Sequence, residues 1–324
     1  MKKNKQNSVK NYQTNKTIRE IYEKTFNKTS EDIVITILKG GMKNAVYLIE
    51  DIDKKVVLKI APKDESKMIT VDRDILWWES KMLRLFDNSE LPTPKLLAYD
   101  DTCELCESPY LFMTYIDGQN YLQCKDELSQ KERERIEYQL GKISHKICQI
   151  KGTDFFLPSE PTKQFHNNYE FVLNLFDLLL KDALSENIDL GPNGYSIIYD
   201  ILDSNMESLN NITDIKLCHT DIWDGNVLIN NGNVVGIVDL ADLYYCDELM
   251  TFYFHTIDGK TSENFLKGFN NRTLNKDEKI RIEIYRMYVI LKMIVDCVLK
   301  QYGKFDWMYQ NLNTRIDTLS RCRK

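Results

Sequence analysis

Residues 217–226 read LCHTDIWDGN, the most distinctive pattern in the chain. It places a histidine, an aspartate and an asparagine in the order His-x-Asp-x-x-x-x-Asn, with Asp221 as the aspartate. The stretch opens a non-helical island at residues 217–245 that lies between expected helices. Three residues at fixed spacing match by chance too often to stand alone, so their meaning depends on the sequence around them.

The residues after this loop predict a β-hairpin that holds two oxygen-bearing side chains together. Val227–Asn230 and Val234–Val238 are apolar runs that flank an Asn-Gly pair, a strong signal for a two-residue turn. Asn226 stands at the entry of the hairpin and Asp239 at its exit. Both side chains offer hard oxygen ligands, the kind that Mg²⁺ takes alongside phosphate oxygens. The hairpin therefore predicts a Mg²⁺ site made by Asn226 and Asp239.

Residues 30–117 predict a small lobe built on an antiparallel sheet. Runs rich in Val and Ile alternate with turn residues, which predicts a meander of hairpins. Apolar residues at helical spacing predict one helix over residues 74–86. Residues 1–29 are expected to form a loose polar arm followed by a short helix over residues 18–27. The expected strands cover residues 33–38, 44–50, 55–61, 96–99 and 110–116.

Two features of this small lobe point to a phosphate-binding site. Gly40 and Gly41 join two expected strands, and adjacent glycines let a backbone turn closely around phosphate groups. Lys59 lies among apolar strand residues, where an unpaired charge is costly. An ATP phosphate together with a carboxylate from the helix would satisfy this lysine. The candidates for that carboxylate are Glu79 first, with Asp72 and Asp74 as alternatives.

Residues 118–324 predict a larger, mainly helical lobe. Ser129 and Glu132 fit a capping box at the start of a helix, and apolar stripes predict further helices over residues 169–184, 198–209 and 279–302. The loop and hairpin described above form a non-helical island at residues 217–245. The whole chain therefore predicts an α+β fold with two lobes, a small antiparallel-sheet N-lobe and a mainly helical C-lobe, with the break at residues 117–118.

Composition and charge exclude several classes of protein. The 324 residues are 43% hydrophobic and 28% charged, typical of a globular protein. No apolar run approaches the roughly 20 residues of a membrane span, and the N-terminal residues lack the apolar segment of a signal peptide. We therefore expect a cytoplasmic protein that has no membrane partner.

The charge is distributed unevenly along the chain. The net charge is −6, and residues 1–118 hold 19 basic and 19 acidic residues, so the excess of 30 acidic over 24 basic residues falls in residues 119–324. This balance argues against a nucleic acid partner, which needs a basic surface. It fits either a cationic partner of the second part or a solvated acidic surface. The sequence contains nothing that fixes an oligomeric state.

These motifs, taken together over residues 30–260, resemble the aminoglycoside phosphotransferase family. This family comprises antibiotic and small-molecule kinases related to protein kinases, and it also includes choline kinases and fructosamine kinases. The wording HTDxWDGN resembles the peptide-antibiotic (viomycin-type) branch in particular. The resemblance implies a protein-kinase-like fold with ATP between the lobes. It rests on Gly40, Gly41 and Asn44, Lys59, Glu79 in WESKML, the hinge-like LFMTYIDG at 111–118, the loop around Asp221, and Asp239 in IVD.

The resemblance also implies a role for each motif residue. Asp221 would be the catalytic aspartate that orients the acceptor hydroxyl, and Asn226 and Asp239 would hold Mg²⁺. Lys59 would contact the α- and β-phosphates of ATP and would itself be held by Glu79. The other implied nucleotide contacts are Gly40, Gly41 and Asn44 around the phosphates, and the backbone of Thr114, Tyr115 and Ile116 at the adenine.

The acceptor is less closely defined. After Asp239 the chain reads Leu-Ala-Asp, where many relatives have an aromatic residue followed by Glu or Gly. The acidic second part favours an amine-bearing hydroxyl acceptor, such as an aminoglycoside, a basic peptide antibiotic, choline or an amino sugar. The alternatives are a metabolic kinase for choline, a sugar or a fructosamine, and a non-catalytic nucleotide-binding regulator; ATP and GTP are not distinguished. The candidate substrate contacts are Trp223, Asp242, Asp247 and Glu248, which also fit loop packing and solvated charges.

A single Cys-x-x-Cys pair, Cys103 and Cys106, lies between two expected strands. A zinc site of this type would need a second pair of ligands at similar spacing, and none follows. The pair therefore predicts a loop or hairpin turn, with metal or redox chemistry as the alternative.

Overall fold

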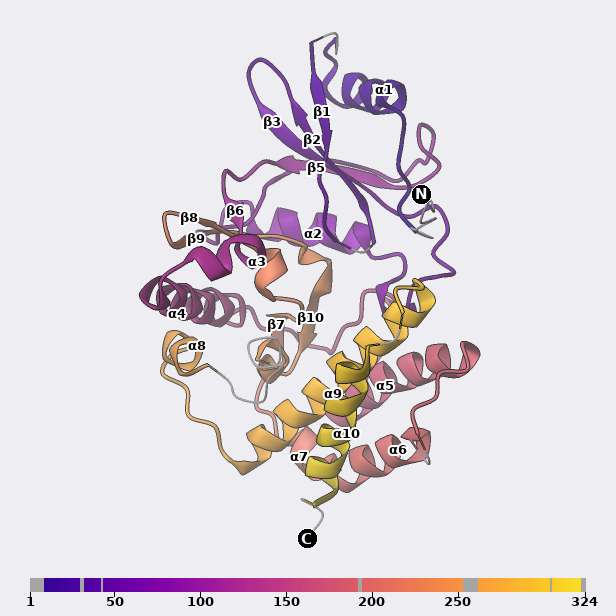
Figure 1. The fold of residues 1–324 in the computed structure, drawn as a ribbon, viewed down its shortest axis with the longest axis vertical. Coiled ribbons are helices and arrows are strands. Elements are labelled where there is room, and N and C mark those ends of the chain that lie inside the picture. Colours follow the sequence, from indigo (N-terminus) through magenta and orange to yellow (C-terminus); the bar gives the residue numbers. More distant parts are fainter. Residues whose placement is uncertain are drawn as a thin grey trace.

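Two lobes, one based on a sheet and one on helices, make up the chain (Figure 1). The computed structural model describes residues 9–29, 32–41, 43–191, 194–252, 262–303 and 305–321. The sheet lies at the top of the view, and the long C-terminal helices lie at its foot. The predicted α+β fold with a small antiparallel-sheet N-lobe and a helical C-lobe is confirmed.

The N-lobe sheet has five strands in the order β1-β2-β3-β5-β4. All neighbouring strands are antiparallel, so the predicted meander is confirmed. The strand predicted over residues 110–116 ends at Thr114, two residues early. Residues 115–118 then join the lobes without regular secondary structure. The strands are β1 (Val34–Ile37), β2 (Ala45–Glu50), β3 (Lys55–Ile60), β4 (Leu96–Asp100) and β5 (Tyr110–Thr114).

Helices cover both faces of this sheet. Five consecutive residues of β3 are buried, because α1 (Asn15–Phe26) packs on one face and α2 (Leu76–Phe86) on the other. α1 begins three residues before its predicted start, where the side chain of Thr14 accepts a hydrogen bond from the backbone N of Thr17. The helix therefore shares the hydrophobic core of the N-lobe, to which it contributes Ile18, Ile21 and Tyr22.

The connection between β3 and α2 leaves the N-lobe and contacts the C-lobe. Its 3₁₀ turn, Thr70–Asp72, lies against α5 (Asn168–Ser185). There the backbone N of Thr70 donates to Oδ2 of Asp182 at 2.6 Å, and Thr70 Oγ1 donates to Oδ1 at 2.7 Å. This contact holds the segment that precedes α2 against the larger lobe.

The C-lobe is mainly helical, as predicted, and the capping box of Ser129 and Glu132 is present at the start of its α4 helix. One helix predicted over residues 198–209 is divided into two at Asn205. Three C-lobe helices, α3, α8 and α10, were not predicted. No helix in the described residues is long and apolar enough to span a bilayer. The remaining helices are α3 (Tyr121–Cys124), α4 (Gln130–Ile147), α6 (Gly194–Ser204), α7 (Met206–Asn210), α8 (Glu263–Gly268), α9 (Lys276–Leu299) and α10 (Asp306–Arg321).

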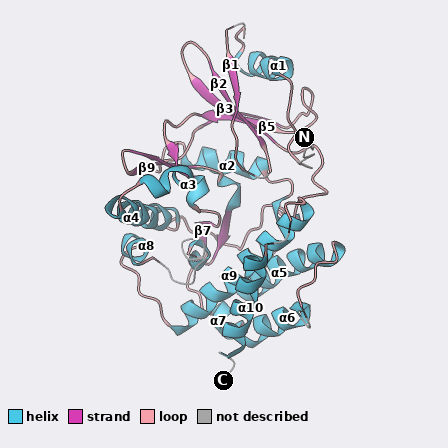
Figure 2. Ribbon diagram, in the orientation of Figure 1, coloured by secondary structure: helices cyan, strands magenta, loops and turns pink. Residues whose placement is uncertain are grey.

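Two small sheets lie between the N-lobe and the long helices of the C-lobe (Figure 2). In one, β7 (Lys216–His219) pairs with β10 (Leu243–Cys246). In the other, β8 (Val227–Asn230) pairs with β9 (Asn233–Ile237) and with the short β6 (Gln119–Asn120). The predicted hairpin is therefore confirmed, and the LCHTDIWDGN stretch leads from the first sheet into the second.

The Cys-x-x-Cys pair lies in the connection between β4 and β5, in agreement with the predicted turn. Cys103 is exposed and Cys106 is buried, and both are free thiols, as are the other five cysteines of the described residues. Within the same part of the chain, no group of three or more His, Cys, Asp or Glu side chains is placed to hold a metal.

Candidate active site

The ion pair between Lys59 and Glu79 is set by the alternation of side chains along β3. Val57 and Ala61, two residues to either side of Lys59, pack in the same core as α2, so Lys59 faces that helix. Its Nζ lies 2.9 Å from Oε1 and 2.6 Å from Oε2 of Glu79. The structure thus pairs Lys59 with Glu79, rather than with Asp72 or Asp74.

The same ammonium group also contacts the C-lobe. Lys59 Nζ lies 2.7 Å from Oδ1 of Asp239, the residue that follows the hairpin. Burial by itself lowers the pKa of Lys59, but the charges of Asp239 and Glu79 outweigh burial and raise that pKa. For Asp239, burial raises the pKa, and Lys59 and Lys43 lower it by more. The pair is therefore charged on both sides, as an ion pair needs to be when it is taken out of water.

The hairpin brings Asn226 next to Asp239. Its register pairs Val227 with Ile237, and the backbone N of Val238 donates to the backbone O of Asn226 at 3.0 Å. Asp239 then takes a left-handed conformation with φ of 64°, which ends the strand and starts a 3₁₀ turn. The backbone of the hairpin thus places Asn226 and Asp239 side by side, as its sequence predicts.

Asn226 also holds Asp221 in place. Its Nδ2 donates at 2.8 Å to both the backbone O and the carboxylate Oδ2 of Asp221. These bonds use the amide nitrogen of Asn226, so its side-chain oxygen is the atom that a cation can take. Burial and the negative charge of Asp242 raise the pKa of Asp221, against the opposing charges of Lys292 and Lys43.

His219 braces this loop. The backbone N of Asp221 donates to Nδ1 of His219 at 3.2 Å, and His219 Nε2 lies 3.4 Å from the carbonyl oxygen of Val238. Nδ1 is then the acceptor and Nε2 the donor, which is the arrangement of a neutral ring. Burial lowers the pKa of His219, in agreement with this neutral form.

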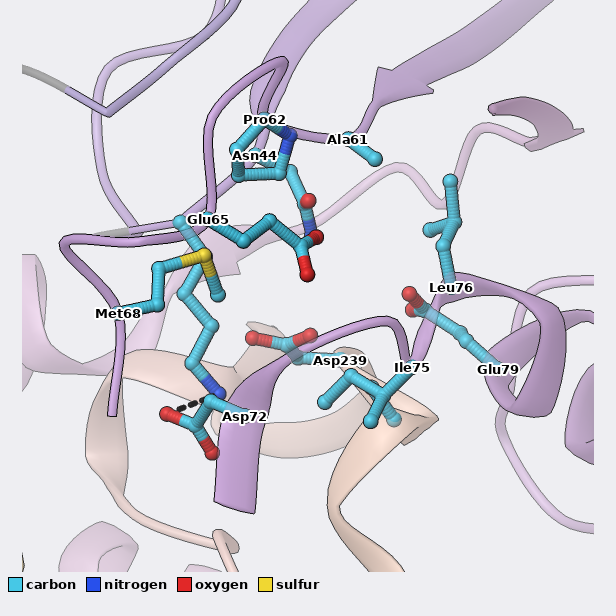
Figure 3. Close-up of a pocket in the computed structure, with 12 residues that line it drawn as sticks. Asn44, Ala61, Pro62, Glu65, Met68, Asp72, Ile75, Leu76, Glu79 and Asp239 are labelled. Carbon is cyan, nitrogen blue, oxygen red and sulfur yellow. Dashed lines mark ion pairs between the residues drawn. The ribbon is translucent and has the colours of Figure 1, made fainter. Parts of the chain in front are cut away.

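A pocket in the described part of the chain lies between the glycine loop and the β3–α2 connection (Figure 3). The carboxylates of Asp239 and Glu65 point into it, and Asp72 lies at one side. Trp78, next to Glu79 on α2, donates from Nε1 to the backbone O of Leu243 at 2.7 Å, so this wall is tied to the C-lobe. The lining residues are Lys43, Asn44, Ala61, Pro62, Glu65, Met68, Asp72, Ile75, Leu76, Glu79, Asp239 and Ala241.

The glycine loop has the backbone that the sequence predicts. Gly40 and Gly41 have φ of 128° and 59°, and a Cβ on either would meet no atom within 4 Å. Glycine is therefore needed for the positive φ and not for lack of space. Asn44 lines the pocket at the end of the loop. At the other expected nucleotide contact, Thr114 ends β5, and Tyr115 and Ile116 lie in the connection between the lobes.

The candidate substrate residues fall into two groups. Trp223 is 39% exposed, and its ring covers Gly225 within its own loop. Asp242 lies close to Asp221 but is buried and paired with two lysines. The structure does not bring the other two to the pocket. Asp247 is buried against Arg281 and Tyr285, and Glu248 is paired with Lys216 and Arg272.

Sequence reasoning missed a group of four charges beside this pocket. Lys43 and Lys292 each contact both Asp72 and Asp242, at distances between 2.8 and 3.3 Å. The four residues come from the glycine loop, α9, the β3–α2 connection and the turn after Asp239. Nothing in the sequence around Lys292 indicates that this lysine of a long helix is buried. Lys43 could have been singled out, because it lies two residues after the glycine pair.

Comparison with known proteins gives one matching family and several similar structures. The family described as the phosphotransferase enzyme family matches residues 34–280. No curated protein matches the chain. A thermostable mutant of the aminoglycoside phosphotransferase APH(4)-Ia, solved in a ternary complex with AMP-PNP and hygromycin B, is 16% identical, with a TM-score of 0.66 over 93% of this chain and 98% of that chain.

Two further solved structures are similar at the same level. A putative fructosamine-3-kinase from Haemophilus somnus 129PT is 16% identical, with a TM-score of 0.67 over 94% of this chain and 97% of that chain. The aminoglycoside phosphotransferase APH(2'')-IIa, solved with streptomycin and ATP, is 17% identical, with a TM-score of 0.59 over 96% of this chain and 97% of that chain. At these identities the likeness establishes the fold.

Proposed function

Because the chain belongs to the phosphotransferase enzyme family, we propose that it is a kinase that transfers the γ-phosphate of ATP to a hydroxyl group of a small amine-bearing molecule. One observation carries the proposal. Lys59 of the N-lobe and Asp239 of the C-lobe meet at 2.7 Å, and Glu79, which lines the pocket together with Asp239, also holds the lysine. A triphosphate and its metal ion need this combination of a cation and a carboxylate, supplied from two sides.

The residues at the hairpin suit a Mg²⁺ ion. Asp239 offers a carboxylate, and Asn226 offers the side-chain oxygen that is left when its nitrogen bonds Asp221. Mg²⁺ is held by few protein oxygens when phosphate oxygens complete its coordination, so two such side chains suffice. When bound, the ion supplies positive charge to the β- and γ-phosphates.

Asp221 is the residue that would act on the acceptor. Its carboxylate would accept a hydrogen bond from the acceptor hydroxyl and aim that oxygen at the γ-phosphorus. A bond would form between the acceptor oxygen and phosphorus, the bond to the bridging oxygen would break, and ADP would leave with the electron pair. The hydroxyl proton would pass to the carboxylate of Asp221. Positioning and electrostatics would supply most of the acceleration.

The nucleotide would be held at both ends of the cleft. The backbone of Gly40 and Gly41, with Asn44 at the end of their loop, would enclose the phosphates. The backbone of Thr114, Tyr115 and Ile116 in the interlobe connection would meet the adenine. This division assigns residues 30–117 mainly to the nucleotide and residues 118–324 mainly to the metal and acceptor.

The amine of the acceptor is inferred from charge. The acidic excess of the chain lies in residues 119–324, which also supply Asp221. Asp247 and Glu248 are already neutralised by neighbouring cations, so they are not part of this proposal. Trp223, an exposed side chain two residues after Asp221, would pack against the acceptor.

A metabolic kinase is the second candidate, and the similarity to a putative fructosamine-3-kinase favours it as much as the aminoglycoside kinases favour a role in resistance. A screen of ADP release separates the two. The purified protein, with ATP and Mg²⁺, is assayed against aminoglycosides, tuberactinomycin-type peptides, choline, hexoses and fructosamines. An increase in ADP release with one class identifies the acceptor, and Asp221→Ala must abolish it. If no amine-bearing class gives release above the acceptor-free rate, the proposed acceptor is wrong.

A further inference from the structure

A second lysine reaches the pocket from the glycine loop. Lys43 follows the two glycines, and its Nζ lies 2.8 Å from Oδ2 of Asp72 and 3.3 Å from Oδ2 of Asp242. The first of these ion pairs is the dashed line in Figure 3. The side chain is 18% exposed, so this ammonium group is largely removed from water.

The carboxylates that hold Lys43 already have another cation. Lys292 of α9 contacts Oδ1 of Asp72 at 2.9 Å and Oδ1 of Asp242 at 3.1 Å. Each carboxylate therefore retains one lysine when Lys43 leaves. Lys292 extends from a 24-residue helix fixed by packing, whereas Lys43 extends from a loop with two glycines of positive φ. Lys43 is thus the member of the group that a movement of the loop can release.

The pocket needs positive charge once a triphosphate enters it. Among its lining residues in the described chain, four are acidic, namely Glu65, Asp72, Glu79 and Asp239, and Lys43 is the one that is basic. Lys59 pairs with Glu79 and Asp239, and Lys292 pairs with Asp72. A triphosphate placed here adds several negative charges beside these carboxylates, so further cations are needed close to it.

These observations lead to one inference about the loop, and this inference rests on the proposed function. We propose that Lys43 is a phosphate-binding residue, which exchanges Asp72 and Asp242 for the γ-phosphate when Mg²⁺–ATP binds. The ion pairs in the structure are then the resting position of Lys43. Its departure also uncovers the carboxylate of Asp242 beside Asp221.

A purely structural clamp would use the same contacts. In that case Lys43 would hold the loop on the C-lobe at all times. Its charge would then change the affinity for every nucleotide to a similar degree. A direct contact with the γ-phosphate instead predicts a loss that depends on the number of phosphates. Comparing a triphosphate analogue with ADP therefore separates the two.

The test measures dissociation constants of AMP-PNP and ADP by calorimetry, with Mg²⁺ present, for the wild type and three variants. We expect Lys43→Met to bind AMP-PNP about tenfold more weakly and ADP within about twofold of the wild type. Lys43→Arg, which keeps the charge, should retain most of the AMP-PNP affinity. Lys39→Met removes an exposed lysine of the same loop and should change neither constant.

Two results would overturn the inference. If the affinity for AMP-PNP is unchanged in Lys43→Met, Lys43 does not contact the γ-phosphate. If the affinities for AMP-PNP and ADP fall equally, Lys43 is a structural clamp. If Lys43→Met does not fold, Lys43→Gln takes its place under the same criteria. If the wild type binds neither nucleotide, the proposed function fails as well. Normal binding by the wild type with no selective loss in the Lys43 variants refutes this inference alone.

Discussion

Lys59 Nζ and Asp239 Oδ1 lie 2.7 Å apart, although the residues are 180 positions apart in the chain. One belongs to a strand of the N-lobe sheet and the other to the turn after the C-lobe hairpin. Both are charged and the lysine is buried, so the contact links the two lobes at the point where we place the triphosphate.

Asp221→Ala should abolish phosphate transfer and keep nucleotide binding. The variant removes the group that orients the acceptor hydroxyl and takes its proton, an effect of typically 10²–10⁴-fold on rate. Steady-state ADP release, measured with an identified acceptor, should fall by at least about 100-fold. Calorimetry with AMP-PNP should give a dissociation constant close to that of the wild type. Full turnover in the variant would show that Asp221 has no such role.

Asp239→Ala should remove the dependence of nucleotide affinity on Mg²⁺. The variant deletes the carboxylate that we assign to the ion, and Asn226 alone is a poor ligand set for a hard cation. The measurement is ATP affinity with and without Mg²⁺, which should differ in the wild type and coincide in the variant. Asp224→Ala is a suitable control, because Asp224 lies in the loop around Asp221 and its carboxylate is paired with Lys125. Mg²⁺ dependence that persists in Asp239→Ala would place the ion elsewhere.

Lys59→Met should weaken nucleotide binding and also destabilise the protein. It leaves Glu79 buried without its cation, and loss of one partner of a buried ion pair costs about 3–5 kcal/mol. The double variant Lys59→Met/Glu79→Gln removes the charges of Lys59 and Glu79 but keeps that of Asp239, so it should recover part of the free energy of unfolding, as measured in urea. Nucleotide affinity should stay low in the double variant. Recovery of affinity together with stability would mean that Lys59 acts on the fold and not on the phosphates.

Gly141→Ala should destabilise the C-lobe without a direct effect on the site. A Cβ at Gly141 on α4 would lie 2.1 Å from the backbone O of Phe265 on α8, so the two helices would have to separate. Overpacking of this kind costs about 1–3 kcal/mol. The melting temperature of Gly141→Ala should fall. Lys142→Ala, an exposed change on the same helix, should alter the free energy of unfolding by no more than about 0.5 kcal/mol. Equal stability of the two variants would contradict the close approach.

Local patterns in the sequence were enough to predict the five N-lobe strands and the hairpin, and to make Glu79 the first candidate partner of Lys59. A lysine inside an apolar strand requires a partner, and the following helix offered one at the right distance along the chain. Asn226 and Asp239 were predictable because an Asn-Gly turn fixes the two ends of a hairpin relative to each other. In these cases the physical constraint acts over a short stretch of chain.

The parts that could not be predicted depend on distant contacts. Asp72 was an alternative partner for Lys59, and it instead meets Lys292 because the β3–α2 connection lies against the C-lobe. The helix predicted over residues 198–209 is divided at Asn205, whose side chain donates to the carbonyl of Ile201 at 2.8 Å. The periodicity of apolar residues continues across this break, so it gave no sign of one.

The most direct test of the account is the crystal structure of the wild-type protein with Mg²⁺ and AMP-PNP. We predict the nucleotide between the lobes, with Lys59 on its phosphates, the ion between Asn226 and Asp239, and Asp221 facing the γ-phosphate. A nucleotide bound away from this cleft, or an ion that contacts neither Asn226 nor Asp239, would contradict it.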